Sequence, residues 1–154
     1  MKPFRLAFLS LLFTFSMLFL SACAAPTSRT LENQERDAVL AYSEAKTDRL
    51  LAALTSGDYK EFTADMDPIM VKGMPEENFN KLRDSLFKKL GQYISREVEA
   101  VSAVSQGGDF FVVEYLARYD LDEKVTIRVV FTADETHKVT GLWFNSPTLN
   151  QTKE

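Results

Sequence analysis

Residues 98–119, VEAVSAVSQGGDFFVVEYLARY, carry alternating apolar and polar residues on both sides of Gly107-Gly108. Alternation with a period of two is typical of a β-strand that buries one face. Two glycines between such runs predict a two-residue hairpin turn, because the favoured turns require positive φ angles. This register places Val104 opposite Phe111. The stretch therefore predicts an antiparallel hairpin at the centre of a sheet.

The chain after residue 91 extends this hairpin into a meander of β segments at about 93–105, 109–119, 124–133 and 137–146. The loop lengths set the remaining register. The expected pairs are Ala100–Tyr115, Val98–Ala117, Glu97–Arg118, Tyr115–Val129 and Ile127–Trp143. The predicted inner face consists of Val98, Ala100, Val104, Phe111, Val113, Tyr115, Ala117, Tyr119, Val125, Ile127, Val129, Phe131, Val139 and Trp143.

Three amphipathic helices are predicted before the sheet, over residues 30–56, 58–67 and 75–90. The second should end before Pro68, because proline disfavours an α conformation in the residue that precedes it. The third should close at Gly91. Helices followed by a curved antiparallel meander of four strands predict an α+β fold, with the three helices packed on the inner face.

Four stretches resemble known domains: LTSGDYKEFTADMD (54–67), FNKLRDSLFKKLGQY (79–93), VTIRVVF (125–131) and VTGLWF (139–144). Their order resembles the nuclear-transport-factor-2-like or cystatin-like superfamily, and most of residues 35–147 resembles a family of uncharacterised bacterial and archaeal domains within it. The resemblance implies a roll with a cone-shaped cavity between helices and sheet. It implies no activity and supplies no catalytic residue.

The N-terminus has the layout of a secretory signal: Lys2 and Arg5 come first, followed by an uncharged run over 6–22. Leu20-Ser21-Ala22-Cys23 resembles the lipobox of bacterial lipoproteins. The resemblance implies cleavage before Cys23 and attachment of a diacylglycerol to its sulfur. An uncleaved membrane anchor, or a secreted protein with one free cysteine, are the alternatives.

The resulting expectation is an exported lipoprotein that contacts the membrane through the lipid on Cys23. Ala24 resembles the outer-membrane sorting signal if the organism is Gram-negative, and the cell surface is expected otherwise. The expected divisions are a signal peptide (1–22), a lipidated cysteine with a short tether (23–29), one α+β domain (30–147) and a tail (148–154). Cleavage changes the formal net charge from −4 to −6, because Lys2 and Arg5 are removed. That charge argues against nucleic-acid binding.

Within the predicted cavity, the polar and aromatic candidates are Tyr42, Asp65, Tyr115, Tyr119 and Trp143. Such residues could position or protonate a small apolar ligand. The alternative is that the aromatic rings simply fill the core. His137, the single histidine, is expected in the last hairpin and is not a candidate base.

No metal site or cofactor is predicted. With one histidine, and with its one cysteine expected to be lipidated, the chain offers mainly carboxylates as ligands. Asp65-Met66-Asp67 and Asp120-Leu121-Asp122-Glu123 lack the ligand count and the glycine of a calcium loop. The sequence also lacks a glycine-rich phosphate loop and a Gly-x-Ser-x-Gly elbow.

The outer face of the sheet mixes apolar and charged residues, which is unusual for a solvated face. The candidates for a partner surface there are Val112, Leu116, Arg118, Arg128, Leu142 and Phe144. Contact with a protein partner or a second copy would bury such a patch. Coverage by the aliphatic stems of Lys and Arg side chains and by the C-terminal residues 146–154 is the alternative.

Two functions are compatible with these features. The first is a non-catalytic, membrane-tethered binding or assembly module that uses the sheet face. The second is small-molecule binding or acid–base catalysis in the cavity. An enclosed cavity of a few hundred Å³ with a tyrosine hydroxyl or Asp65 pointing into it would favour the second, and a filled interior would favour the first.

Overall fold

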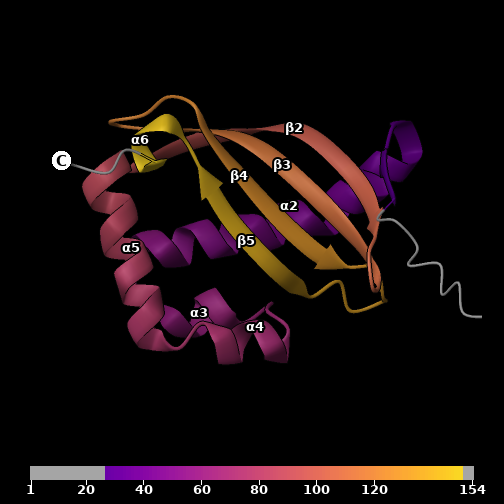
Figure 1. Cartoon of the computed structure of the whole chain (residues 1–154), viewed down its shortest axis with the longest axis horizontal. Coiled ribbons are helices and arrows are strands. Elements are labelled where there is room, and N and C mark those ends of the chain that lie inside the picture. The colour runs from indigo at the N-terminus through magenta and orange to yellow at the C-terminus, as the bar shows by residue number, and fades with distance from the viewer. Residues whose placement is uncertain (1–26, 151–154) are drawn as a thin grey trace, which may run out of the picture.

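The computed structural model describes residues 27–150 (Figure 1). The elements, in chain order, are β1 (Thr27–Thr30), α2 (Asn33–Ser56), α3 (Tyr59–Thr63), α4 (Pro68–Gly73), α5 (Glu76–Leu90), β2 (Tyr93–Ser105), β3 (Asp109–Tyr119), β4 (Val125–Thr132), β5 (Val139–Asn145) and α6 (Pro147–Asn150).

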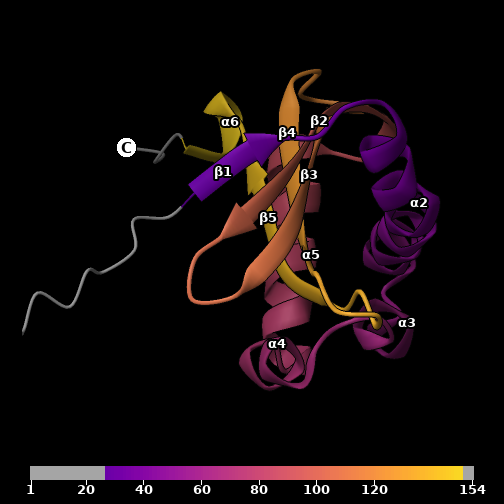
Figure 2. The ribbon, with the colours of Figure 1, turned by 90° about the vertical axis from the view of Figure 1, so that its right-hand side faces the viewer.

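The five strands form one antiparallel sheet in the order β1-β2-β3-β4-β5. Figure 2 shows α2 beside one face of this sheet. The α+β class is confirmed, but the described residues contain five helices and five strands instead of three and four. The additional helices are short, and the additional strand lies in a segment where no element was expected.

That strand, β1, corrects the expected tether. Thr27 pairs with Ser105, so residues 27–29 belong to the sheet. Leu31 follows directly, is buried and donates its backbone N–H to the oxygen of Val101 at 2.7 Å. The polar, small residues of this segment suit an exposed edge strand, which the absence of apolar alternation concealed.

Pro68 begins a helix instead of only ending one. Asp67 adopts an extended conformation, as a residue before proline prefers, and its carboxylate accepts the N–H of Met70 at 2.7 Å. This is N-cap geometry, with proline at the first helical turn where its missing N–H costs nothing. The helix α3 therefore ends at Thr63, and α4 is separate.

The first and last predicted helices are close to expectation. α2 begins at Asn33 and not directly after Thr30, and it ends at Gly57 with φ of 80°. Two small polar residues of α2, Ser43 and Thr47, are fully buried against the sheet. α5 matches its predicted range and ends at Gly91.

The β2–β3 hairpin has a three-residue loop, because Ser105 pairs with Asp109 and Val104 with Phe110. The predicted two-residue turn is wrong by one position. A bulge at Glu99 then restores the inward direction of Val98, which pairs with Tyr115. Ala100 and Val104 were predicted inside, whereas Val101 and Ala103 contact the core. The predicted Glu97–Arg118 pair is also wrong.

The β4–β5 pair contains a second bulge, at Thr140 between the pairs Val130–Gly141 and Phe131–Val139. A bulge inserts one residue and exchanges the faces of every residue beyond it. Trp143 therefore pairs with Arg128 on the outer face, and the expected pairing with Ile127 is wrong. The β3–β4 register also differs, by two residues, which leaves the faces unchanged: Tyr115 pairs with Ile127, not Val129.

The inner face of β2 carries one charge, Arg96, whose side chain is 6% exposed. Its guanidinium donates to Glu44 Oε1 at 2.9 Å and to Asp48 Oδ1 at 2.8 Å, both on α2. It also lies 4.2 Å from the ring centroid of Tyr115. Burial lowers the pKa of Arg96, but the hydrogen bonds to Glu44 and Asp48 outweigh it, so the pKa is raised. Arg96 therefore joins α2 to the sheet as a permanent cation.

We expect Arg96→Ala to lower the free energy of unfolding by about 2–4 kcal/mol, because charged hydrogen bonds, a cation–π contact and packing are lost together. Arg118→Ala is the matched control, since Arg118 is exposed and lies 3.7 Å from Glu123. Arg118→Ala should lower the free energy of unfolding by less than about 1 kcal/mol. Urea denaturation of both variants measures the difference. Equal decreases in the free energy of unfolding of the two variants would show that Arg96 does not stabilise the packing of α2 on the sheet.

Candidate functional site

A cavity of about 300 Å³ lies where the C-terminal ends of α2 and α5 meet the sheet. The apolar part of its wall includes Leu51, Leu54, Leu86 and Phe87. Most of the accessible wall is apolar. Phe87 is 61% exposed, although it belongs to the apolar stripe of α5. An exposed phenylalanine on the wall of an apolar cavity gives the opening an apolar rim.

Two tyrosines form the sheet side of the cavity. The rings of Tyr93 and Tyr119 pack edge to face, with centroids 5.6 Å apart. Burial raises the pKa of both phenols, and in Tyr119 the neighbouring phenol of Tyr93 adds to the effect. Within residues 27–150 neither hydroxyl makes a protein hydrogen bond. Both phenols are protonated at neutral pH and are available as donors.

The polar side of the wall includes Arg83 and Asp84 of α5. Arg83 Nε donates to the backbone oxygen of Leu54 at 3.1 Å, which fixes the guanidinium against the end of α2. A side chain at Gly57 would have its Cβ 3.3 Å from Cζ of Arg83, so the glycine leaves room for it. Among the described residues no carboxylate forms an ion pair with Arg83.

Gly91 shapes the junction between α5 and β2, beside the cavity. Its φ is 78°, and a Cβ there would lie 2.8 Å from Cβ of Asp120 and 3.2 Å from Cγ of Leu121. Glycine therefore lets the β3–β4 loop approach the helix end, where the Leu121 N–H donates to the oxygen of Leu90 at 2.9 Å. Leu121 is 66% exposed, so an apolar side chain is open to solvent beside Gly91.

Of the five cavity candidates, only Tyr119 lines this cavity. Tyr115 is fully buried beneath Arg96, and its hydroxyl lies 3.2 Å from Oγ1 of Thr47. Trp143 is on the outer face of the sheet, a consequence of the bulge at Thr140.

The remaining two candidates are also away from the cavity. Tyr42 stacks on His137 with ring centroids 3.9 Å apart and lies edge-on to Phe131. Asp65 accepts a hydrogen bond from Arg49 at 2.6 Å, in an ion pair that connects α2 with the end of α3. Tyr42 therefore packs between α2 and the sheet, whereas Asp65 connects two helices.

The sequence prediction missed Tyr93, Arg83 and Asp84. Tyr93 was placed at the start of a strand, and its direction could not be inferred because the register shifts again between Tyr93 and Ser95. Arg83 and Asp84 lie within the helix predicted over residues 75–90 and were not among the candidates. Phe87 gave no usable signal either, because adjacent apolar residues in a helix can both be buried, as Leu50 and Leu51 of α2 are.

The structure leaves three of the six residues predicted for a partner surface exposed on the outer face. Leu116, Arg118 and Arg128 lie exposed on the outer face, whereas Val112, on the same face, is buried. The bulge at Thr140 turns the remaining two candidates inward: Leu142 pairs with Val129 and Phe144 with Ile127, and both pack against the core. The outer face is therefore less apolar than expected.

Cys23 lies outside the described residues. Between residues 27 and 150, no group of three or more His, Cys, Asp or Glu side chains is arranged to hold a metal ion. In the same range, no helix has the length and apolarity needed to cross a bilayer.

Residues 48–142 match the model of a family described as "Protein of unknown function (DUF3887)". The match agrees with the expectation of an uncharacterised domain. No curated protein and no solved structure matches the chain.

We expect the phenol of Tyr115 to make folding sensitive to alkali. Burial raises the pKa of Tyr115 to about 12, against the opposing effect of the hydrogen bond to Thr47, whereas a tyrosine in the unfolded chain ionises near pH 10. A raised folded-state pKa stabilises the fold below pH 10, and this contribution is lost as the pH rises towards 12. The loss is about 2–3 kcal/mol for this group.

Urea denaturation between pH 8 and 12 measures the effect, with Tyr115→Phe as the comparison. The variant should lose less free energy of unfolding above pH 10 than the parent. Between pH 8 and 9 the two should show the same dependence. If the free energies of unfolding of the parent and of Tyr115→Phe changed in parallel from pH 8 to 12, the alkaline sensitivity would not come from Tyr115.

Proposed function

This chain belongs to the DUF3887 family, whose function is unknown, and we propose that it is an exported, lipid-anchored module that binds a small apolar ligand without transforming it. The observation that carries the proposal is the apolar cavity beside α5, with the two phenols of Tyr93 and Tyr119 in its wall. Apolar walls with few polar groups are the usual composition of small-molecule sites.

The polar groups of the cavity suit recognition. A phenol that stays protonated at neutral pH donates a hydrogen bond to a ligand carbonyl, hydroxyl or ether. Arg83 adds a cation at the same wall, and Asp84 lies beside it, so the local charge is balanced. The expected ligand has an apolar body that fits about 300 Å³ and one polar end.

Binding is favoured over acid–base catalysis because the predicted base candidate lies outside the cavity, and the carboxylate that does line it, Asp84, lies beside the guanidinium of Arg83. Asp65, the base candidate, is committed to Arg49 outside the cavity. A general base must reach the proton that it removes. The raised phenol pKa values leave Tyr93 and Tyr119 uncharged and therefore weak as bases at neutral pH.

The proposal also includes the superfamily to which this α+β fold belongs. We infer a nuclear-transport-factor-2-like or cystatin-like roll from one long helix, α2, along the inner face of an antiparallel sheet (Figure 1). The cavity between helices and sheet lies where that superfamily would place a ligand. The lipobox-like Leu20-Ser21-Ala22-Cys23 supports export and anchoring.

A neutral fluorescent probe tests the cavity. N-phenyl-1-naphthylamine should bind the domain saturably and gain fluorescence, because the apolar walls exclude water from the dye. Phe87→Asp should weaken this binding at least tenfold, since a carboxylate at the rim opposes entry of an apolar group. Ile69→Asp is the matched control: Ile69 is 83% exposed on α4 and does not line the cavity.

The control should bind the dye like the parent, and circular dichroism should show that both variants are folded. Tyr119→Phe, which removes only a hydroxyl, should leave dye binding unchanged because the dye needs no strong donor. Absence of saturable binding by the parent, or equal loss in both aspartate variants, would refute the cavity assignment.

The anchor is tested separately by Cys23→Ala. The variant should lose labelling by radioactive palmitate and accumulate as unprocessed precursor, because lipoprotein processing requires the sulfur as acceptor. Gel mobility and salt extraction of membranes report the two effects. Maturation to the parent size with retention in salt-washed membranes would contradict lipid attachment at Cys23.

A further inference from the structure

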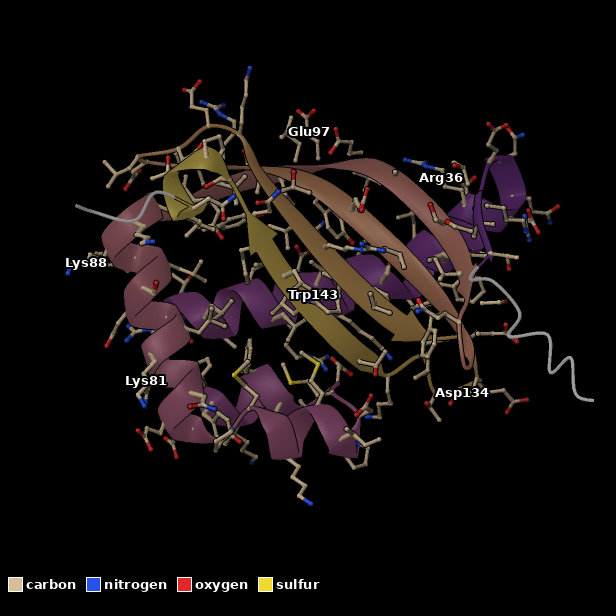
Figure 3. The ribbon with its side chains drawn as sticks, in the orientation of Figure 1. Arg36, Lys81, Lys88, Glu97, Asp134 and Trp143 are labelled. Atoms are coloured by element: carbon tan, nitrogen blue, oxygen red, sulfur yellow. The ribbon has the colours of Figure 1, made fainter. Side chains whose placement is uncertain are left out.

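The outer face of the sheet carries a second hollow, opposite the helices. Glu114, Arg128 and Trp143 are directly paired across β3, β4 and β5, so their side chains form one row. Together with Thr126, Val130 and Asn145 they line a shallow hollow of about 420 Å³. Figure 3 shows Trp143 on β5, with α2 behind the sheet. The hollow therefore lies on the face of the sheet that α2 does not cover.

The indole of Trp143 packs over the backbone of Gly141. Gly141 faces the same side two residues earlier, and a Cβ there would overlap the six-membered ring of the indole. The absence of a side chain at Gly141 therefore lets the ring rest over the strand. Trp143 nevertheless remains 55% exposed. A tryptophan that is supported from below and open above is a stacking surface.

The polar neighbours are balanced in charge. Arg128 Nε lies 3.7 Å from Glu114 Oε1, and the two side chains are 48% and 38% exposed. The pair is near neutral, so it attracts neither anions nor cations strongly. Both groups keep unused hydrogen-bonding positions, because a guanidinium has five donors and a carboxylate can accept about four bonds. Thr126 and Asn145 add further donors and acceptors along the edge.

This composition suits a small polyhydroxylated ligand better than a protein. Among the described residues, the strand pairing places two large, exposed apolar side chains on this face, Leu116 and Trp143. A stable protein interface buries about 800 Å² per partner around an apolar centre. Leu142 and Phe144, which would have supplied such a centre, face the core.

We propose that this hollow binds a neutral oligosaccharide. One pyranose ring stacks its C–H face on the indole of Trp143, whose π surface carries partial negative charge. The neighbouring hydroxyls bond to Glu114 and Arg128, since planar two-pronged groups match adjacent hydroxyls. The site is separate from the cavity beside α5, and the two can be tested independently.

The chain contains one tryptophan, so its fluorescence reports on this site alone. Titration of the domain with the pentamer of β-1,4-linked N-acetylglucosamine, and with cellopentaose, should change the intensity or wavelength of emission saturably in the millimolar range or below for at least one of the two. Arg128→Met, which keeps the reporter, should weaken that binding at least fivefold. Phe87→Ala, a change at the other cavity, should leave it unchanged.

Gly141→Val tests the support of the indole, since the added side chain displaces the ring, and it should weaken binding at least tenfold. Thermal melting establishes that this variant folds, and Trp143→Ala, followed by calorimetry, replaces it if it does not. No response of the parent to either pentasaccharide overturns the proposal. Equal responses of the parent and Arg128→Met also overturn it. So does an emission change that follows protein concentration without sugar, because a second copy would then be the occupant.

Discussion

The position of one buried cation, Arg96, constrains the rest of the fold. Its guanidinium meets Glu44 and Asp48, which are four residues apart and therefore share one face of α2. A charge that is buried to this extent is strongly unfavourable without such partners. The helix must consequently lie over β2 with these carboxylates towards the sheet. Once α2 is fixed there, its C-terminal turn and α5 leave the cavity at the far end of the sheet.

Arg96 reaches the inner face only because of the bulge at Glu99. Without the additional residue, alternation would turn Glu97 and Glu99 inward and Arg96 outward. Glu97 would then face Glu44 and Asp48, and three carboxylates at close range repel each other. The bulge and the ion pair therefore support each other: the bulge directs the guanidinium inward, and its loss would place like charges between helix and sheet.

Local signals in the sequence were sufficient for the classes of the elements. The amphipathic pattern and the closing Gly91 predicted α5. The sequence did not predict correctly which face of the sheet the side chains beyond a bulge occupy. The bulge at Thr140 places Trp143 on the outer face and Leu142 and Phe144 on the inner face. Side chains alternate with a period of two, so one inserted residue exchanges the faces of all residues after it.

Bulges are poorly visible in a single sequence for a physical reason. Neither Glu99 nor Thr140 has a backbone requirement, such as an obligatory positive φ, that only glycine satisfies. The bulge at Thr140 accompanies a local contact, in which the indole of Trp143 lies over Gly141. The bulge at Glu99 depends on long-range partners, the carboxylates of α2. The site residues Tyr93 and Tyr119 share this dependence, since their common cavity exists only after α5 has packed on the sheet.

The two ends of β2 lie at opposite ends of the sheet, and this separates the cavity from the proposed anchor. Thr27 pairs with Ser105 at the C-terminal end of β2, and only three residues lie between Thr27 and Cys23. Tyr93, at the other end of the strand, lines the cavity. At about 3.3 Å per residue, the strand places them roughly 35–40 Å apart. If Cys23 carries the lipid, the cavity therefore lies at the end of β2 opposite to the end at which the chain comes from its anchor.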